Sequence, residues 1–161
     1  MSLAGAQEFS AEVAAPVRDC FAAITDFDAY PAWSPAIEEI HVLERYPDGL
    51  ARLVEFHINM KLKTLRYVLE YEYNEPHRLT WHSVEGDIQS IEGSYEFEKL
   101  TARTTQATCR QAVVTGFWVP GPIRRLLERS AVQQSVLEFK AEAERRSRAA
   151  AKPRAKSKVR S

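Results

Sequence analysis

Cysteine is scarce in this sequence, and the placing of the two that are present excludes several kinds of site. Cys20 and Cys109 stand far apart in apolar stretches, with no CxxC pair and no Cys/His ligand spacing. This pattern argues against a zinc ribbon, a disulfide scaffold and a thioredoxin-like centre. We expect both thiols to be small buried side chains in a reducing compartment.

Long apolar runs are missing as well. No stretch of about 18 or more apolar residues occurs, and the N-terminus has no basic region followed by an apolar one. We therefore expect neither a membrane span nor a signal peptide. Together with the cysteine usage, this predicts an unexported, cytoplasmic protein.

Motifs for bound nucleotides and common hydrolases are absent. The sequence has no glycine-rich phosphate loop, no GxSxG elbow and no HExxH helix, so we expect no cofactor. Three of the four histidines, His41, His57 and His82, alternate out of phase with their apolar neighbours, and His77 falls in a turn. They should face away from a core, so we assign no catalytic residue and no metal ligand.

Charge is distributed unevenly along a chain whose formal net charge is zero. Eight of the 22 basic residues and none of the 22 acidic ones fall in residues 145–161. We predict one domain over residues 1–146 and a basic disordered tail over 147–161. The tail could contact RNA, the ribosome or an anionic membrane, or it could serve solubility alone.

Hydrophobic periodicity predicts an α+β fold. Residues 9–15 alternate as a strand, and Pro16 opens a helix with one apolar face. Residues 26–35, rich in aromatics and proline, should form a non-helical connection. Six strands, separated by turn residues, then cover 37–46, 50–60, 62–74, 78–85, 89–99 and 104–114, and a helix spans 123–146. We expect a curved antiparallel sheet of about seven strands around the long helix, with a hollow between them.

The period-two pattern also assigns an inner face to the sheet. That face should carry Ile40, Val42, Val54, Phe56, Ile58, Leu65, Tyr67, Leu69, Tyr71, Leu79, Trp81, Ile91, Tyr95, Phe97, Ala107, Cys109 and Val113. By the spacing of three and four, the helix should turn towards the sheet a face made of Ile123, Leu126, Leu127, Ser130, Gln134, Leu137 and Ala141.

Several short patterns resemble those of a known superfamily. They are Ala15-Pro16-Val17, the Asp26 to Pro35 segment, Ile91 to Tyr95, and Val119-Pro120-Gly121. With the element order, they resemble the START-like (SRPBCC) superfamily over about residues 6–145, and more narrowly the bacterial polyketide cyclase/dehydrase proteins related to the coenzyme-Q-binding family. The resemblance implies a helix-grip (Bet v 1-like) fold whose cavity holds a lipid, an isoprenoid quinone, a polyketide or a similar apolar molecule.

Inner-face and loop positions supply the candidate ligand-binding residues. We predict a mostly apolar wall with a few polar groups, made of Phe56, Met60, Tyr67, Tyr71, Trp81, Tyr95, Gln111, Phe117, Trp118, Leu127 and Gln134. The alternative is that these side chains only fill a core. Arg52 and Glu85 share the inner-face parity and could orient a polar group or transfer a proton, or else lie at the rim.

Three hypotheses for function follow. The favoured one is a non-catalytic protein that binds or transports a hydrophobic small molecule. The second is a polyketide cyclase, aromatase or dehydratase, which would need convergent ionisable groups deep in the cavity. The third is an interaction module for RNA or the ribosome, supported by the basic tail. The sequence does not indicate an oligomeric state.

Overall fold

The computed structural model describes residues 6–59, 64–118 and 120–160, with side-chain detail outside 121–128 and 151–160. Strand β1 (Gln7–Val13) leads into helix α1 (Val17–Thr25), the short helices η1 (Phe27–Ala29) and α2 (Tyr30–Trp33), and six strands. These are β2 (Ile37–Arg45), β3 (Ala51–Asn59), β4 (Thr64–Asn74), β5 (Arg78–Gly86), β6 (Ser90–Thr101) and β7 (Thr104–Val114). Helix α3 (Gly121–Arg160) follows.

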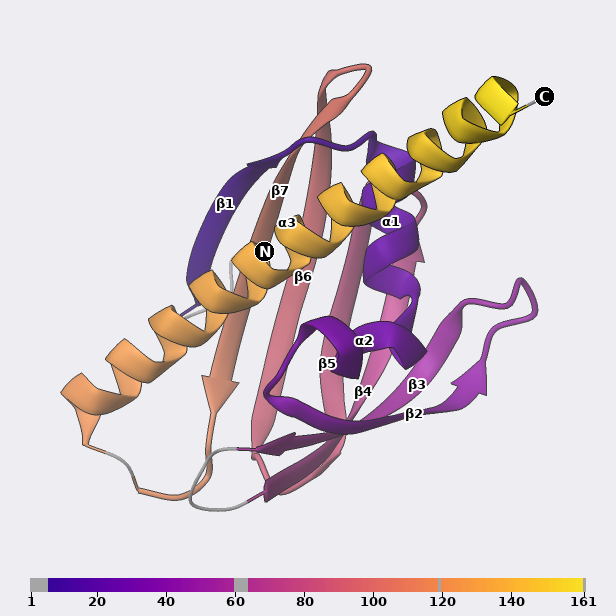
Figure 1. Ribbon diagram of the computed structural model, residues 1–161. Coiled ribbons are helices and arrows are strands. Elements are labelled where there is room, and N and C mark those ends of the chain that lie inside the picture. The colour runs from indigo at the N-terminus through magenta and orange to yellow at the C-terminus, as the bar shows by residue number, and fades with distance from the viewer. Residues whose placement is uncertain (1–5, 60–63, 119, 161) are drawn as a thin grey trace.

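All seven strands belong to one antiparallel sheet in the order β1-β7-β6-β5-β4-β3-β2. From β2 to β7 each strand pairs with its neighbour in the chain, and β1 closes onto β7, so that Phe9 lies opposite Cys109. The three α-helices lie on one face of the curved sheet, with α3 crossing it diagonally (Figure 1). This is the expected α+β helix-grip architecture, and the predicted strands agree with the observed ones to within a few residues.

The predicted inner face is confirmed by burial. Val54, Leu79 and Ala107 are at most 1 % exposed, and Cys109 and Phe97 are nearly as well covered. Cys20 and Cys109 are free and buried, as expected. None of the helices in the described residues is both long enough and apolar enough to cross a membrane.

The connection over residues 26–35 differs from its prediction. It contains the 3₁₀ turn η1 and the one-turn helix α2, in which Pro31 occupies the first turn. Proline is tolerated there because that backbone N–H would have no intrahelical partner. The tyrosine ahead of it, Tyr30, is buried and donates a hydrogen bond from its hydroxyl to the Ile24 carbonyl, which ties α2 to the end of α1.

The predicted face of the long helix is wrong over its described side chains. The buried residues of α3 are Val132, Val136, Phe139 and Ala143, together with Glu142, whereas Ser130, Gln134, Leu137 and Ala141 are exposed. Both series have helical spacing. The buried series is the one that packs into the core, where α3 lies mainly against β1, α1 and β7. Phe139 of this series contacts Tyr95 and Phe97 on β6.

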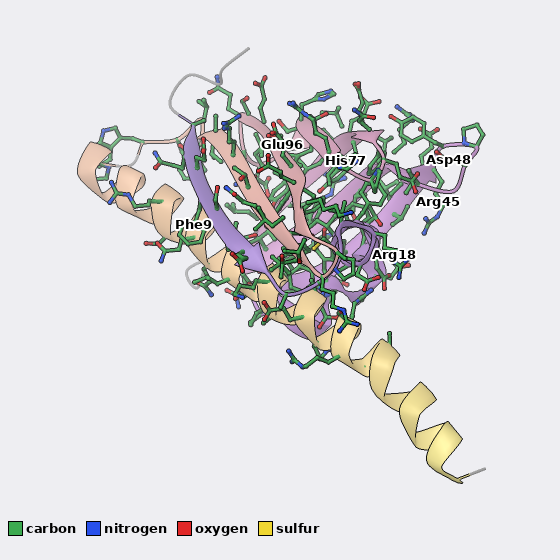
Figure 2. The ribbon with its side chains drawn as sticks, turned by 90° about the horizontal axis from the view of Figure 1, so that it is seen from above. Phe9, Arg18, Arg45, Asp48, His77 and Glu96 are labelled. Carbon is green, nitrogen blue, oxygen red and sulfur yellow. The ribbon has the colours of Figure 1, made fainter. Side chains whose placement is uncertain are left out.

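Helix α3 is also longer than predicted, since it continues past residue 146 to Arg160. Its last turns extend beyond the sheet (Figures 1 and 2). Alanine, lysine and arginine dominate this stretch and are strong helix formers, which favours a helix, whereas Pro153 within it opposes one. The division into a domain over 1–146 and a tail over 147–161 stays a prediction.

Candidate functional site

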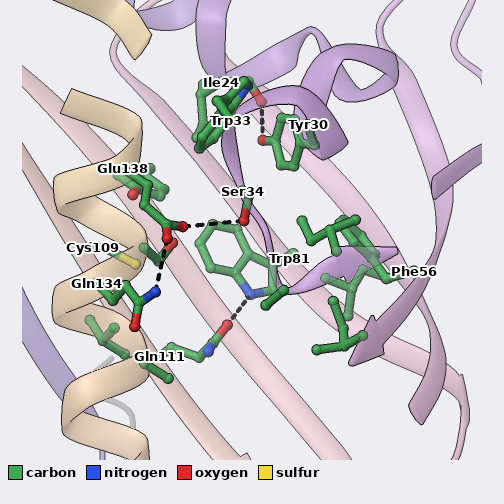
Figure 3. A pocket seen from close by; sticks show the side chains of 18 of the residues that line it. Ile24, Tyr30, Trp33, Ser34, Phe56, Trp81, Cys109, Gln111, Gln134 and Glu138 are labelled. Carbon is green, nitrogen blue, oxygen red and sulfur yellow. Dashed lines mark hydrogen bonds between the residues drawn. The ribbon is translucent and has the colours of Figure 1, made fainter. Parts of the chain in front are cut away.

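A cavity of about 280 Å³ lies between the sheet, the segment around α2, and α3 (Figure 3). Strands β3 to β7 form its wall, the chain from α2 to β2 lines one side, and α3 lines the other. The lining residues on strands β3 to β7 are Phe56, Ile58, Tyr67, Leu69, Tyr71, Leu79, Trp81, Tyr95, Cys109 and Gln111. Those from α1 to the start of β2 are Ile24, Tyr30, Trp33, Ser34, Ala36 and Ile37. Those on α3 are Ala131, Val132, Gln134, Ser135 and Glu138.

Aromatic rings dominate the sheet side of the cavity. Phe56 stacks on Tyr67 with a centroid separation of 5.4 Å. Trp81 lies between Tyr71 and Tyr95, at 5.9 and 6.0 Å. Because such rings carry large flat apolar surfaces on stiff side chains, they form a wall suited to a flat or aliphatic ligand.

The indole of Trp81 is fixed at both its polar and its apolar parts. Its Nε1 donates a hydrogen bond of 3.1 Å to Gln111 Oε1 on β7. Across the β5–β6 pair, Trp81 faces Gly93, where a Cβ atom would come within 2.4 Å of the indole carbons. Gly93 therefore gives the ring the room to lie over β6, and Gln111 fixes its orientation.

Two buried polar atoms of the cavity wall have no hydrogen-bond partner in the described part of the chain: Trp33 Nε1 and Tyr95 Oη. Ser135 on α3 interacts with the Tyr95 hydroxyl without reaching hydrogen-bond geometry. Leaving such a group unpaired costs about 1–3 kcal/mol. Folded proteins pair most buried polar groups, so two unpaired ones in a single cavity indicate places where a ligand atom could bond.

The tyrosines of the wall are held neutral. Burial raises the pKa of Tyr71 and Tyr95 well above the usual tyrosine range, and burial alone raises that of Tyr67. A phenolate in this apolar setting would lack solvation. These side chains can therefore donate or accept hydrogen bonds at neutral pH, but they do not act there as ionised bases.

Glu138, which the sequence patterns did not single out, supplies the carboxylate of the cavity. Its Oε1 accepts a hydrogen bond of 3.3 Å from the Ser34 hydroxyl, and its Oε2 accepts one of 2.9 Å from the Gln134 amide. The first of these bonds spans the cavity from α3 to the chain after α2 (Figure 3). Glu138 stands one helical turn after Gln134, which was a predicted ligand-binding residue, and that spacing was the available signal.

Arg52 and Glu85 do not face the cavity, contrary to their parity. The β2–β3 register shifts so that Glu44 pairs with Leu53 and Arg45 with Ala51, which leaves Arg52 unpaired in a bulge. A second shift, between β4 and β5, leaves Val84 unpaired before Glu85. Because each extra residue inverts the alternation of side chains, Arg52 and Glu85 lie on the outer face of the sheet. There Arg52 forms ion pairs with Glu44 and Glu70, and Glu85 forms one with Arg66.

The structure brings together seven of the eleven predicted ligand-binding residues. Phe56, Tyr67, Tyr71, Trp81, Tyr95, Gln111 and Gln134 all line the cavity. Phe117 and Trp118 do not: they lie between β7 and α3 and are 46 % and 84 % exposed. Met60 and the side chain of Leu127 lie outside the described residues.

The strand histidines lie on the outer face with acidic neighbours. His82 is 3.3 Å from Glu70, and His57 is 3.1 Å from Glu55. Glu39, His41 and His57 bring one ligand atom each within 4.8 Å of one another, a set that could hold a transition-metal ion. Two of the three are exposed, and the cluster lies on the face of the sheet opposite to the cavity lining, so it adds no chemistry to the cavity.

Comparison with known proteins agrees with this geometry. The family described as polyketide cyclase / dehydrase and lipid transport matches residues 13–140. The chain belongs to this family. No match was found among curated proteins.

Solved structures with the same architecture include an aromatase/cyclase and proteins without a named activity. A START superfamily protein from Mycobacterium smegmatis is 24 % identical, with a TM-score of 0.74 over 89 % of this chain and 97 % of that one. The Zhui aromatase/cyclase from a Streptomyces species is 22 % identical, with a TM-score of 0.75 over 91 % and 97 %. A protein from Thermus thermophilus is 19 % identical, with a TM-score of 0.74 over 91 % and 99 %. At these identities the likeness shows the START-like fold.

Proposed function

We propose that this protein binds a compact, largely apolar, ring-containing small molecule between the sheet and α3. The observation that carries this proposal is the aromatic-walled cavity with two unpaired polar atoms, Trp33 Nε1 and Tyr95 Oη. Covering about 200 Å² of apolar ligand surface would contribute roughly 5 kcal/mol before the costs of association are subtracted.

The size of the cavity narrows the ligand. Pockets that enclose drug-sized molecules measure about 300–1,000 Å³, and this cavity, at about 280 Å³, lies just below that range. A molecule of two or three fused rings suits this volume. A long isoprenoid tail would have to extend out of the cavity.

Native mass spectrometry of the purified protein, followed by solvent extraction, tests the proposal directly. A stoichiometric aromatic or polycyclic molecule carried from the host is the expected result. A defined probe, 2-acetylnaphthalene, then gives an affinity through quenching of the fluorescence of the cavity tryptophans, Trp33 and Trp81.

A matched pair of helix variants shows whether the probe occupies this cavity. Ala131 and Gln133 are both exposed on α3, but Ala131 lines the cavity and Gln133 does not. Ala131→Trp should fill the cavity and weaken probe binding at least about tenfold, whereas Gln133→Trp should leave it unchanged. Equal affinities for the two variants would contradict the proposal.

A cyclase or dehydratase activity is the second candidate, and Glu138 favours it. This carboxylate faces the cavity beside Ser34 and Tyr95, where it could remove a proton from a carbon next to a carbonyl group. The Zhui aromatase/cyclase has the same fold. Turnover of a carrier-bound poly-β-ketone that disappears in Glu138→Gln but persists in Glu92→Gln would establish it.

Two further expectations stay proposals that rest on sequence alone. They are a cytoplasmic location and contact of the basic residues 147–161 with RNA, ribosomes or anionic membranes. Deleting residues 147–161 and measuring co-sedimentation with ribosomes tests the second, since the deletion should abolish any such association.

A further inference from the structure

The charge on the cavity wall is of one sign. Among the lining residues with described side chains, Glu138 is the only acidic one, and there is no lysine, arginine or histidine. The cations that follow Glu138 most closely along α3 have other partners: Lys140 pairs with Glu144, Arg145 with Glu142, and Arg146 with Glu142 and Asp26. Glu138 makes no ion pair with any described residue, so its negative charge acts on whatever occupies the cavity.

An anionic ligand in the cavity would meet this charge at close range, on a carboxylate that is half-buried. Two like charges a few ångströms apart repel each other, and more strongly the less water lies between them. The two donors bonded to Glu138 are neutral, since the Ser34 hydroxyl and the Gln134 amide each bond to a different oxygen of the carboxylate, and neither cancels its charge. A carboxylate or phosphate ligand therefore finds no cation in the described lining and an unneutralised anion beside it.

The unpaired atoms call for an acceptor oxygen, and the charge of Glu138 decides which kind. An indole N–H can only donate, and a tyrosine hydroxyl can donate or accept. Trp33 Nε1 therefore requires an acceptor, which an ammonium group cannot be, and Tyr95 Oη can serve a second acceptor or a hydroxyl. A neutral carbonyl, ether or hydroxyl oxygen meets these requirements without introducing a charge.

We infer that the cavity selects uncharged, oxygen-bearing ring molecules, and that Glu138 excludes carboxylates of the same shape. The inference rests on the proposed binding function and adds the ligand's charge and polar group to it. Ionised fatty acids and phosphorylated lipids are thereby disfavoured as ligands of the cavity, whereas neutral aromatic ketones, quinones and phenols are admitted.

Three probes with one ring system test the inference: 2-acetylnaphthalene, 2-naphthoate and 2-ethylnaphthalene, titrated at neutral pH by calorimetry or tryptophan fluorescence. The ketone should bind about two- to tenfold more tightly than the hydrocarbon, as one hydrogen bond allows. It should bind at least about tenfold more tightly than the carboxylate, as expected from repulsion by a nearby like charge.

The Glu138→Gln variant identifies the source of the discrimination. It should bring 2-naphthoate to within about threefold of the ketone when both affinities are measured in the same variant. Glu92→Gln, a charge removal on the exposed outer face of β6, should preserve the wild-type ratio.

The possible results distinguish a failure of the charge selectivity from a failure of the proposed binding function. If 2-naphthoate binds wild-type protein as tightly as the ketone, or if Glu138→Gln leaves the ratio unchanged, the inference is overturned and the binding function stands. If none of the three probes binds, both are overturned.

Discussion

The indole of Trp81 occupies the space that a Cβ atom on Gly93 would fill. The two residues face each other across the β5–β6 pair, and such a Cβ would lie 2.4 Å from the ring, far inside van der Waals contact. The glycine is thus required for space, since its backbone lies outside the positive-φ region. The position of the cavity's central ring depends on a residue that has no side chain.

Replacing Gly93 by alanine should displace Trp81 and destabilise the protein by about 1–3 kcal/mol, the usual cost of overpacking. The displaced ring would also lose its bond to Gln111 and weaken probe binding. Urea denaturation and 2-acetylnaphthalene titration measure the two effects. Adding Trp81→Phe should recover part of the stability in the Gly93→Ala background, because a smaller ring relieves the clash; additive effects of the two substitutions would contradict this explanation.

The substitutions Tyr95→Phe and Tyr30→Phe should change the free energy of unfolding by different amounts, although each removes one buried hydroxyl. The Tyr30 hydroxyl bonds to the Ile24 carbonyl, so its loss should cost about 1–2 kcal/mol. The Tyr95 hydroxyl makes no hydrogen bond of good geometry among the described residues and has only the weaker interaction with Ser135. Its loss should therefore be nearly neutral while reducing the preference for a ketone over a hydrocarbon probe. Thermal unfolding of both variants provides the comparison, and an equal loss of stability would show that Tyr95 Oη is paired after all.

Acid should weaken ion pairs within α3. Hydrogen bonds from Arg145, and then from Arg146, lower the pKa of Glu142 below its ordinary value of 4.5, against the effect of burial. A carboxyl whose folded pKa is depressed contributes stability above its unfolded pKa and loses it as the pH falls through the folded value. The free energy of unfolding should therefore decline below about pH 4.5, and less steeply in Glu142→Gln.

Glu92→Gln serves as the control for this pH dependence, because Glu92 is exposed on the outer face of the sheet. It should retain the wild-type slope of stability against pH in urea titrations from acidic to neutral pH. A Glu142→Gln variant with the same slope as the control would mean that the Glu142–arginine pairs do not stabilise the fold.

The two thiols should be inert in the folded protein. Burial raises the pKa of Cys20 to about 11 and that of Cys109 to about 12, and the thiolate is the reactive form. At mildly alkaline pH, labelling with a maleimide should be slow and should accelerate with added urea in parallel with unfolding. Rapid modification of Cys109 without denaturant would show that the cavity admits the reagent.

The strands and their inner face were predictable because a period of two survives along most of the sheet. The prediction failed at Arg52 and Glu85, where one extra residue in a strand inverts the alternation. Nothing in the local sequence marks these bulges, since they depend on the register with a neighbouring strand. Here the error mattered for function, because both residues were the candidates for ionisable groups in the cavity.

Helix α3 shows a second limit. Its sequence carries two helical series, and Leu137 in the exposed one looks as apolar as Val136 in the buried one. The contacts with β1 and α1 decide between them, and those contacts are tertiary. The same ambiguity hid Glu138, whose position relative to the cavity depends on how the helix is rotated about its axis.

The irregular pairing of β2 has a consequence for the molecule's behaviour among its own copies. β2 is one edge of the sheet, and its pairing with β3 skips Glu38 and Leu43. An edge strand that is interrupted and flanked by charges such as Glu39 and Glu44 offers a poor template for a strand from another molecule. The sheet is therefore protected at this edge against edge-to-edge aggregation by the same kind of irregularity that turned Arg52 outward.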